Sequence, residues 1–187
     1  MKIELTQFVR QSLAKDASCS LCETYGIYNF NASPTMTYVT ATASTNDHNY
    51  GIANVSGSSP TMTNVTATAS SNSGEFQAGV FNWNSSPTMI NVTATGVGYN
   101  GPGYGIRNNY SSPIISYSTA TGSDHGVFNL GTSSTKIDHS VIKGYYSIYG
   151  TGFVANTKLD GPISVGSTFT CVGTYDENYV ALNTSCQ

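Results

Sequence analysis

Apolar and polar residues alternate along this chain in short runs, and the same run returns four times. The copies are ASPTMTYVTATAS from Ala32, SSPTMTNVTATAS from Ser58, SSPTMINVTATG from Ser85 and SSPIISYSTATG from Ser111. In the second copy, Val65, Ala67 and Ala69 are each separated by a threonine, which is the period of a β-strand. The alternation changes phase at Asn64, so each copy predicts two short strands joined by a bend.

A second phrase precedes each copy and predicts one more strand, which is the first strand of each coil. It reads YGIYN from Tyr25, YGIAN from Tyr50, AGVFN from Ala78 and YGIRN from Tyr104, and a degenerate unit begins HGVFN at His125. In this strand Ile52 is expected to point inward, with Gly51 and Ala53 outward. The first threonines of the Thr-Ala-Thr triplets lie 26, 27 and 26 residues apart, so each repeat behaves as one turn of a solenoid.

Three strands and three corners per repeat predict an all-β fold, a single-stranded right-handed parallel β-helix of about six to seven coils. The expected organisation is an N-terminal cap over residues 1–24, β-helix repeats over 25–165 and a C-terminal cap over 166–187. Residues 6–15 form an amphipathic segment that predicts a short helix over the first coil. The looser last coils are expected to bury Ile148, Val154 and Leu159, then Ile163 and Val165.

The repeat GIYNxxSSPTMTNVTAT resembles those of bacterial surface and secreted β-helix proteins, including polymorphic outer-membrane-type adhesins. The resemblance covers residues 25–144. It implies the β-helix fold, an extracellular or cell-surface location, and a structural or adhesive role. Similar coils also carry lyases, tailspikes and ice-binding proteins, so the fold leaves the activity open.

Composition narrows the possible partners. Only 9% of residues are charged and the net charge is -3, with seven Lys and Arg in total, so the chain lacks the basic surface that nucleic acid requires. No run approaches the roughly 20 apolar residues that cross a bilayer. His48 and His139 stand singly, and the sequence predicts neither a metal site nor a cofactor.

The four cysteines form two pairs in the sequence. Cys19 and Cys22 make a Cys-x-x-Cys near the start, and Cys171 and Cys186 lie near the end. The pairs do not match a four-ligand zinc pattern. We expect a disulfide between Cys171 and Cys186 that closes the C-terminal cap, with Cys19 and Cys22 free or bridged. That disulfide favours an oxidising compartment.

An asparagine ends the first strand of every coil. Stacked amides at one corner can hydrogen-bond along the solenoid axis, so an internal ladder is expected. Its members are Asn29, Asn54, Asn82, Asn108 and Asn129.

Aromatic residues at outward positions of the first strand suggest a surface that stacks against sugar rings. The candidate glycan-binding residues are Tyr28, Phe81, Trp83, Arg107, Phe128 and Tyr149. The same rings can instead cover gaps between coils or pack under loops. The leading hypothesis is a non-catalytic, structural or adhesive module that binds a glycan or another cell-surface polymer, with end-to-end association of chains also open.

Outward threonines in the third strand support an alternative. The expected grid is Thr40, Thr42, Thr66, Thr68, Thr93, Thr95, Thr119 and Thr121. Threonines two residues apart lie about 6.6–6.8 Å apart, and coils repeat at about 4.8 Å. The grid resembles the Thr-x-Thr arrays of β-helical ice-binding proteins, which implies ice as a partner. Threonine is also simply a favourable outward residue on a strand.

A polysaccharide lyase or hydrolase is the third hypothesis. Such β-helix enzymes cluster acids and bases on neighbouring coils, and Arg107, Asp124 and His125 are the nearest candidates here. A general acid and base need a second convergent carboxylate or base. The sequence offers none, so no catalytic residue is assigned.

Overall fold

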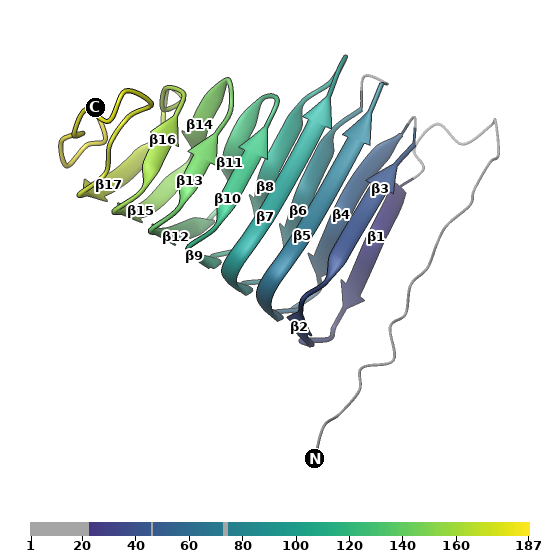
Figure 1. The fold of residues 1–187 in the computed structure, drawn as a ribbon. Coiled ribbons are helices and arrows are strands. Elements are labelled where there is room, and N and C mark those ends of the chain that lie inside the picture. The colour runs from purple at the N-terminus through teal and green to yellow at the C-terminus, as the bar shows by residue number, and fades with distance from the viewer. Residues whose placement is uncertain (1–22, 46, 73–74) are drawn as a thin grey trace.

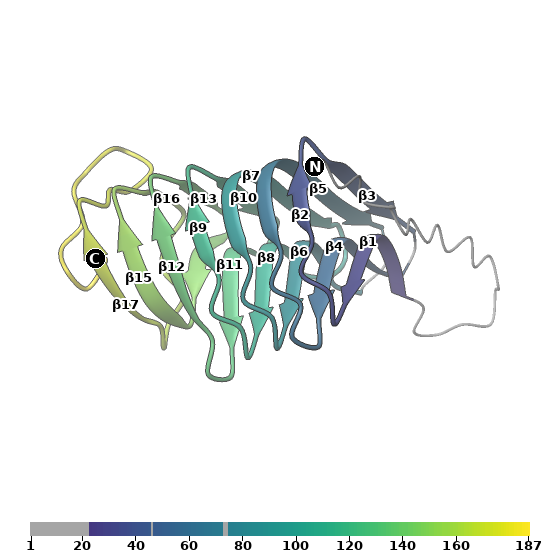
Figure 2. The same cartoon turned by 90° about the horizontal axis from the view of Figure 1, so that it is seen from below.

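The computed structural model describes residues 23–45, 47–72 and 75–187, which form seventeen β-strands and no helix. The strands stack into a parallel β-solenoid that runs from β1 to β17 (Figures 1 and 2). The all-β parallel solenoid predicted from the alternation is therefore confirmed. The helix expected over residues 6–15 and the pair Cys19 and Cys22 lie outside the described residues.

One side of the solenoid is a six-stranded parallel sheet, which we call the aromatic wall. Its strands are β1 (Glu23–Phe30), β4 (His48–Val55), β6 (Gln77–Trp83), β8 (Gly103–Asn109), β11 (His125–Leu130) and β14 (Tyr146–Tyr149). Each strand pairs in parallel with the equivalent strand of the next coil. The chain thus makes five turns between β1 and β14.

A second sheet of eleven strands bends to form the other two sides. The strands β5 (Thr61–Ser71) and β7 (Thr88–Gly98) run through both sides. The second wall contains β2 (Thr35–Thr37), the first halves of β5 and β7, β9 (Ile114–Ser116), β12 (Ser134–Asp138), β15 (Thr151–Ala155) and β17 (Thr168–Val172). The threonine wall contains β3 (Thr40–Ser44), the second halves of β5 and β7, β10 (Thr119–Gly122), β13 (Val141–Lys143) and β16 (Lys158–Asp160).

The bend between the second wall and the threonine wall comes from one left-handed residue per coil. In β5 and β7 it is Asn64 (φ 55°) and Asn91 (φ 52°), and asparagine tolerates this conformation better than most residues. Tyr38, Tyr117 and His139 hold the same corner in other coils, with φ of 56°, 51° and 44°. The strand therefore turns without a loop, as the phase change at Asn64 predicts.

The core is a set of columns that run along the axis. On the aromatic wall the inward column holds Ile52, Val80, Ile106, Val127 and Ile148, all fully buried. Methionines and isoleucines from the second wall and alanines from the threonine wall complete the cluster. Because each coil contacts only its neighbours, stability accumulates coil by coil.

The aromatic and threonine walls approach each other most closely where glycine faces alanine. A Cβ placed on Gly51 would lie 2.6 Å from the backbone nitrogen of Thr68 and 2.6 Å from the carbonyl oxygen of Gly79. The same approach repeats at Gly26, Gly79, Gly105 and Gly126. Gly51 therefore faces the interior, and the expected outward position was wrong, because Tyr50 points outward while both Gly51 and Ile52 point inward.

The asparagine corner forms a continuous buried ladder. Each amide nitrogen donates to the Oδ1 of the next asparagine, at 2.8 Å from Asn29 to Asn54, 2.9 Å to Asn82, 2.8 Å to Asn108 and 2.8 Å to Asn129. These steps span 25, 28, 26 and 21 residues. The repeat is therefore constant in space while its loops vary in length.

The solenoid is shorter than the six to seven coils expected. No strand forms between Asp160 and Thr168, where Gly161 (φ 122°) and Gly166 (φ 84°) turn the chain. Ile148, Val154 and Leu159 are buried as predicted, but Val165 is 91% exposed. The predicted disulfide is confirmed: Cys171 of β17 joins Cys186, with Cα atoms 5.2 Å apart.

Candidate functional site

The outer face of the aromatic wall carries two columns of side chains in register. The first holds Tyr25, Tyr50, Ala78, Tyr104, His125 and Tyr146, and the second holds Tyr28, Ala53, Phe81, Arg107, Phe128 and Tyr149. The second column contains five of the six residues predicted for glycan binding. Trp83 lies two residues beyond Phe81 on β6.

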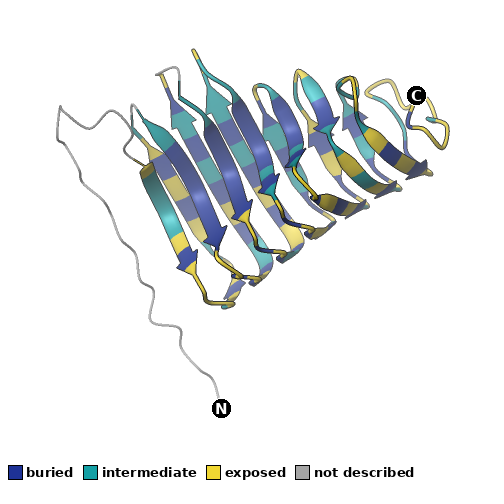
Figure 3. Cartoon of the chain, turned by 180° about the vertical axis from the view of Figure 1, so that it is seen from behind, coloured by how far each residue is buried: buried dark blue, intermediate teal, exposed yellow. Residues whose placement is uncertain are grey.

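Most of these rings pack against one another as a second apolar cluster. Tyr50 stacks on Tyr25 and Phe81, with ring centroids 5.3 and 4.8 Å apart. Phe128 stacks on Tyr149 at 4.8 Å. Phe81 is only 7% exposed, so it does not present its ring to a ligand. Figure 3, which views this wall, shows that most of its strand residues are buried or half-buried.

Phe76 fills the gap that Ala78 leaves in the first column. Its ring contacts Tyr50 and Tyr104, with centroids 5.8 and 6.5 Å away. It also meets the ring of His48 edge-on at 4.3 Å. Phe76 is not among the residues predicted from outward positions, because it precedes β6 and lies outside the repeat. The sequence signal was Ala78, which stands where the neighbouring coils have Tyr50 and Tyr104 and so leaves room for another ring.

Arg107 lies among three aromatic rings. Its guanidinium carbon is 4.1 Å from the Phe76 centroid, 5.3 Å from Tyr104 and 5.9 Å from Phe81. Burial lowers the pKa of the guanidinium, an effect that Tyr104 and Tyr50 partly offset. Within residues 23–45, 47–72 and 75–187 no carboxylate forms an ion pair with Arg107. The positive charge of Arg107 is therefore stabilised by cation–π contacts with these rings.

Burial also raises the pKa of Tyr50 and Tyr104. The Tyr50 hydroxyl donates a hydrogen bond to Glu23 at 3.3 Å, and the Tyr25 hydroxyl donates to the same carboxylate. The Glu23 carboxylate is therefore already hydrogen-bonded to these two tyrosines at the first coil. The hydroxyls remain protonated, and the cluster carries one cation near its centre.

The edge of this cluster combines an exposed tryptophan with buried polar atoms. The Trp83 side chain is 49% exposed and pairs in register with Asn109 of β8. Arg107 lies two residues before Asn109, which places the Cα atoms of Trp83 and Arg107 about 8 Å apart on one face. The Arg107 guanidinium itself is directed towards Phe76 and Tyr104. Arg107 Nε and Asn109 Oδ1 are buried atoms without a hydrogen-bond partner in the described chain. We call Trp83, Arg107 and Asn109 the edge cluster.

Sequence reasoning found two members of the edge cluster and missed Asn109. Asn109 directly follows Asn108, and only Asn108, as an inward member of the ladder, was predicted to have a role. The signal was its register position, because β8 places Asn109 beside the single tryptophan of the chain. Tyr28 is 40% exposed on β1, two strands away from Trp83.

The residues suggested for lyase chemistry are not drawn together around Arg107. Asp124 Oδ2 lies 3.1 Å from Nδ1 of His125, without the alignment of a hydrogen bond. The His125 ring is stacked between Tyr104 and Tyr146, at 6.0 and 5.2 Å. In the part of the chain that the structure describes, no group of three His, Cys, Asp or Glu residues could hold a metal ion.

The threonine wall carries the predicted grid in strict register. Thr40 pairs with Thr66, Thr66 with Thr93 and Thr93 with Thr119, and the second column repeats the pattern with Thr42, Thr68, Thr95 and Thr121. All eight side chains are exposed or half-exposed, whereas the intervening alanines are buried. Val141 and Lys143 of β13 end the grid.

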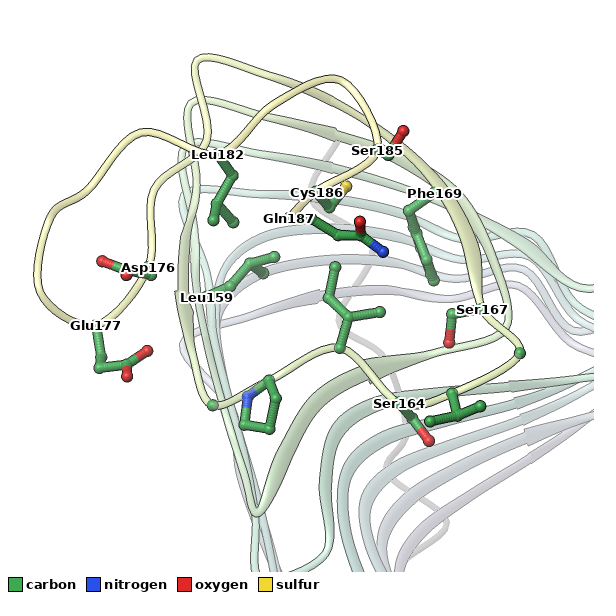
Figure 4. A pocket seen from close by; sticks show the side chains of 15 residues that line it. Leu159, Ser164, Ser167, Phe169, Asp176, Glu177, Leu182, Ser185, Cys186 and Gln187 are labelled. Carbon is green, nitrogen blue, oxygen red and sulfur yellow. The ribbon is translucent and has the colours of Figure 1, made fainter.

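A hollow of about 580 Å³ lies at the C-terminal end of the core. Leu159, Phe169 and Leu182 line its apolar side, and Asp176 and Glu177 lie on the cap loop beside it (Figure 4). It marks the point where another coil would continue the core. Asp176 Oδ1 is used locally, since it accepts hydrogen bonds from the backbone nitrogens of Asn178 and Val180.

Comparison of the chain with protein-family models, curated proteins and solved structures found no match. Among the described residues, no helix is long and apolar enough to cross a membrane.

Proposed function

We propose that this protein is a non-catalytic β-solenoid module that binds a glycan on the outer face of its aromatic wall. The observation that carries the proposal is the half-exposed Trp83, which continues the outward column of Phe81 at the end of β6. An indole face can cover the apolar face of a sugar ring. Neighbouring polar groups can then bond its hydroxyls.

The solenoid suits this task because it holds the cluster rigidly. Trp83 and Asn109 belong to paired strands, and Arg107 is packed against Phe76. Little side-chain entropy is therefore lost when a ligand binds. The disulfide between Cys171 and Cys186 supports a secreted or cell-surface location, where glycans are accessible.

Replacement of Trp83 by Ala is expected to lower glycan affinity about tenfold or more, which corresponds to about 1.4 kcal/mol of lost stacking. Glycan-array binding followed by calorimetry measures the change. Tyr38→Ala is the matched control, because Tyr38 is 82% exposed at a different corner. Equal loss in both variants, or unchanged binding in Trp83→Ala, would remove the edge cluster from the binding site.

The threonine grid supports a second candidate, ice binding. The supporting observation is that four paired rows carry two threonines each, and no charged side chain interrupts the rows. Regular methyl and hydroxyl groups on a flat wall can order water. The competing explanation is cross-strand packing of threonine, which requires no ligand.

Thermal hysteresis and partition into ice test the grid directly. The wild type should shape ice, and Thr66→Tyr combined with Thr93→Tyr should abolish the effect because two bulky rings interrupt the central rows. Thr35→Tyr combined with Thr61→Tyr places the same rings on the second wall and should leave it unchanged. A wild type that neither shapes ice nor enters it ends this hypothesis.

A further inference from the structure

The outer face of the second wall has no part in the glycan site or in the threonine grid. We infer that this face is the interface of a two-fold symmetric homodimer, in which the second walls of two chains pack against each other. Large apolar side chains are exposed there at regular strand positions, namely Ile90, Ile114, Phe153 and Val172. A second copy of the chain is the partner because this face is complementary to itself in charge and in shape.

Two outward columns run along the second wall in register. The first column contains Thr35, Thr61, Thr88, Ile114, Lys136, Phe153 and Thr170. The second column contains Thr37, Thr63, Ile90, Ser116, Asp138, Ala155 and Val172. The residues between the columns, such as Ile115 and Ile137, are buried. Each strand therefore contributes one outward residue to each column.

The two charged residues of these columns lie on the same strand and have opposite signs. Lys136 is in the first column and Asp138 in the second. A two-fold axis that is parallel to the solenoid axis and midway between the columns brings the first column of one chain opposite the second column of the other. Lys136 then faces the partner subunit's Asp138, and symmetry repeats the pair. A two-fold axis along the strands would bring each column opposite itself and leave Lys136 without a carboxylate.

Both charges are accessible to a partner. Lys136 is exposed, and within the described ranges no carboxylate forms an ion pair with it. Hydrogen bonds from His139 and Asn156 lower the pKa of Asp138, so its carboxylate is ionised at neutral pH. A carboxylate has roughly four acceptor positions, and the Asp138 side chain is 44% exposed. It can therefore accept a lysine in addition to its present partners.

The same axis places large side chains opposite small ones. The expected contacts across the interface are Phe153 with Ala155, Ile114 with Ser116, Ile90 with Thr88, and Val172 with Thr170. Seven strands form the wall, and the longer ones contribute five residues each. At about 4.8 Å per strand and 3.3 Å per residue, the contact buries roughly 1,000 Å² in total. That is the size of a weak, reversible interface.

Sedimentation equilibrium over a series of protein concentrations tests the interface. The wild type should show a monomer–dimer equilibrium that weakens as salt increases. Lys136→Asp and Asp138→Lys should each weaken self-association at least about tenfold, because each brings like charges face to face twice. An equimolar mixture of the two variants should form a heterodimer, since one chain then carries two aspartates and the other two lysines. Lys143→Asp makes the same change of charge on the threonine wall and should leave the dimer unchanged.

Each other outcome contradicts the homodimer. A wild type that remains monomeric at millimolar concentration overturns it. Unchanged dimer affinity in both Lys136→Asp and Asp138→Lys, with unfolding midpoints equal to the wild type, places the interface on another surface. A mixture of the two variants that stays monomeric contradicts the two-fold axis, and loss of the dimer in Lys143→Asp moves the contact to the threonine wall. Glycan binding is tested separately, because the aromatic wall is a different side of the solenoid.

Discussion

Replacement of Gly51 by Ala is expected to destabilise the solenoid by about 3 kcal/mol or more, at the upper end of what overpacking costs in a closed core. The added methyl would lie 2.6 Å from two backbone atoms, Thr68 N and Gly79 O. Neither can move alone, because both belong to paired strands. Urea unfolding measures the loss as a lower midpoint at an unchanged slope.

Gly57→Ala is the matched control in the same coil. Gly57 adopts a positive φ of 83°, and a Cβ there would meet no atom within 4 Å. Its substitution should cost only about 1–2 kcal/mol, the ordinary penalty for a left-handed residue. If Gly51→Ala proves no more destabilising than Gly57→Ala, the close approach of the aromatic and threonine walls is wrong.

Replacement of Asn82 by Ala is expected to have the second large effect, roughly 2–6 kcal/mol, because it leaves two buried partners unpaired at about 1–3 kcal/mol each. Asn82 accepts from the amide of Asn54 at 2.9 Å and donates to Asn108 at 2.8 Å. The break lies in the middle of the ladder. Thermal and urea unfolding should both report it.

Asn100→Ala controls for the loss of an asparagine as such. Asn100 is exposed, and its amide donates to the carbonyl oxygen of Asn72 at 2.7 Å. Removal of such a surface bond should change stability by about 0.5 kcal/mol. Equal unfolding midpoints for Asn82→Ala and Asn100→Ala would show that the ladder is not a source of stability.

Alternation predicted the faces of the threonine wall because nothing interrupts the period there. Thr66 and Thr68 face outward while Ala67 is buried, and the pattern repeats in the next coil. The bend at Asn64 was predictable for the same reason, since the phase changes at a residue that accepts a positive φ. Local alternation is enough to predict which side chains face outward wherever the strand is regular.

The aromatic wall shows where alternation fails. After the outward Tyr50, two consecutive residues, Gly51 and Ile52, face inward. Because Gly51 has no side chain, its residue type does not indicate which way it faces. Its role depends on the distance to another wall, which a one-dimensional pattern does not contain. Alternation left open whether Phe81 binds a ligand or packs between coils, and its burial depends on Tyr50, which stacks on it from the neighbouring strand.

The edge cluster was only partly predictable. Trp83 and Arg107 stand out by residue type, but the value of Arg107 as a site depends on what surrounds it. Phe76 reaches it from a variable loop, and the absence of a carboxylate beside it among the described residues is a property of the packed fold. Residue type identifies Trp83 and Arg107 as candidates, but only the packed structure shows which of their polar atoms have hydrogen-bond partners.

Trp83 allows the central claim to be measured directly, since it is the only tryptophan in the 187 residues. Its fluorescence should change saturably when an oligosaccharide that binds on the glycan array is added to the wild type. The Tyr38→Ala variant should show the same response to that sugar as the wild type. Saturable glycan binding with unchanged Trp83 emission would place the ligand elsewhere and contradict a binding site on the aromatic wall.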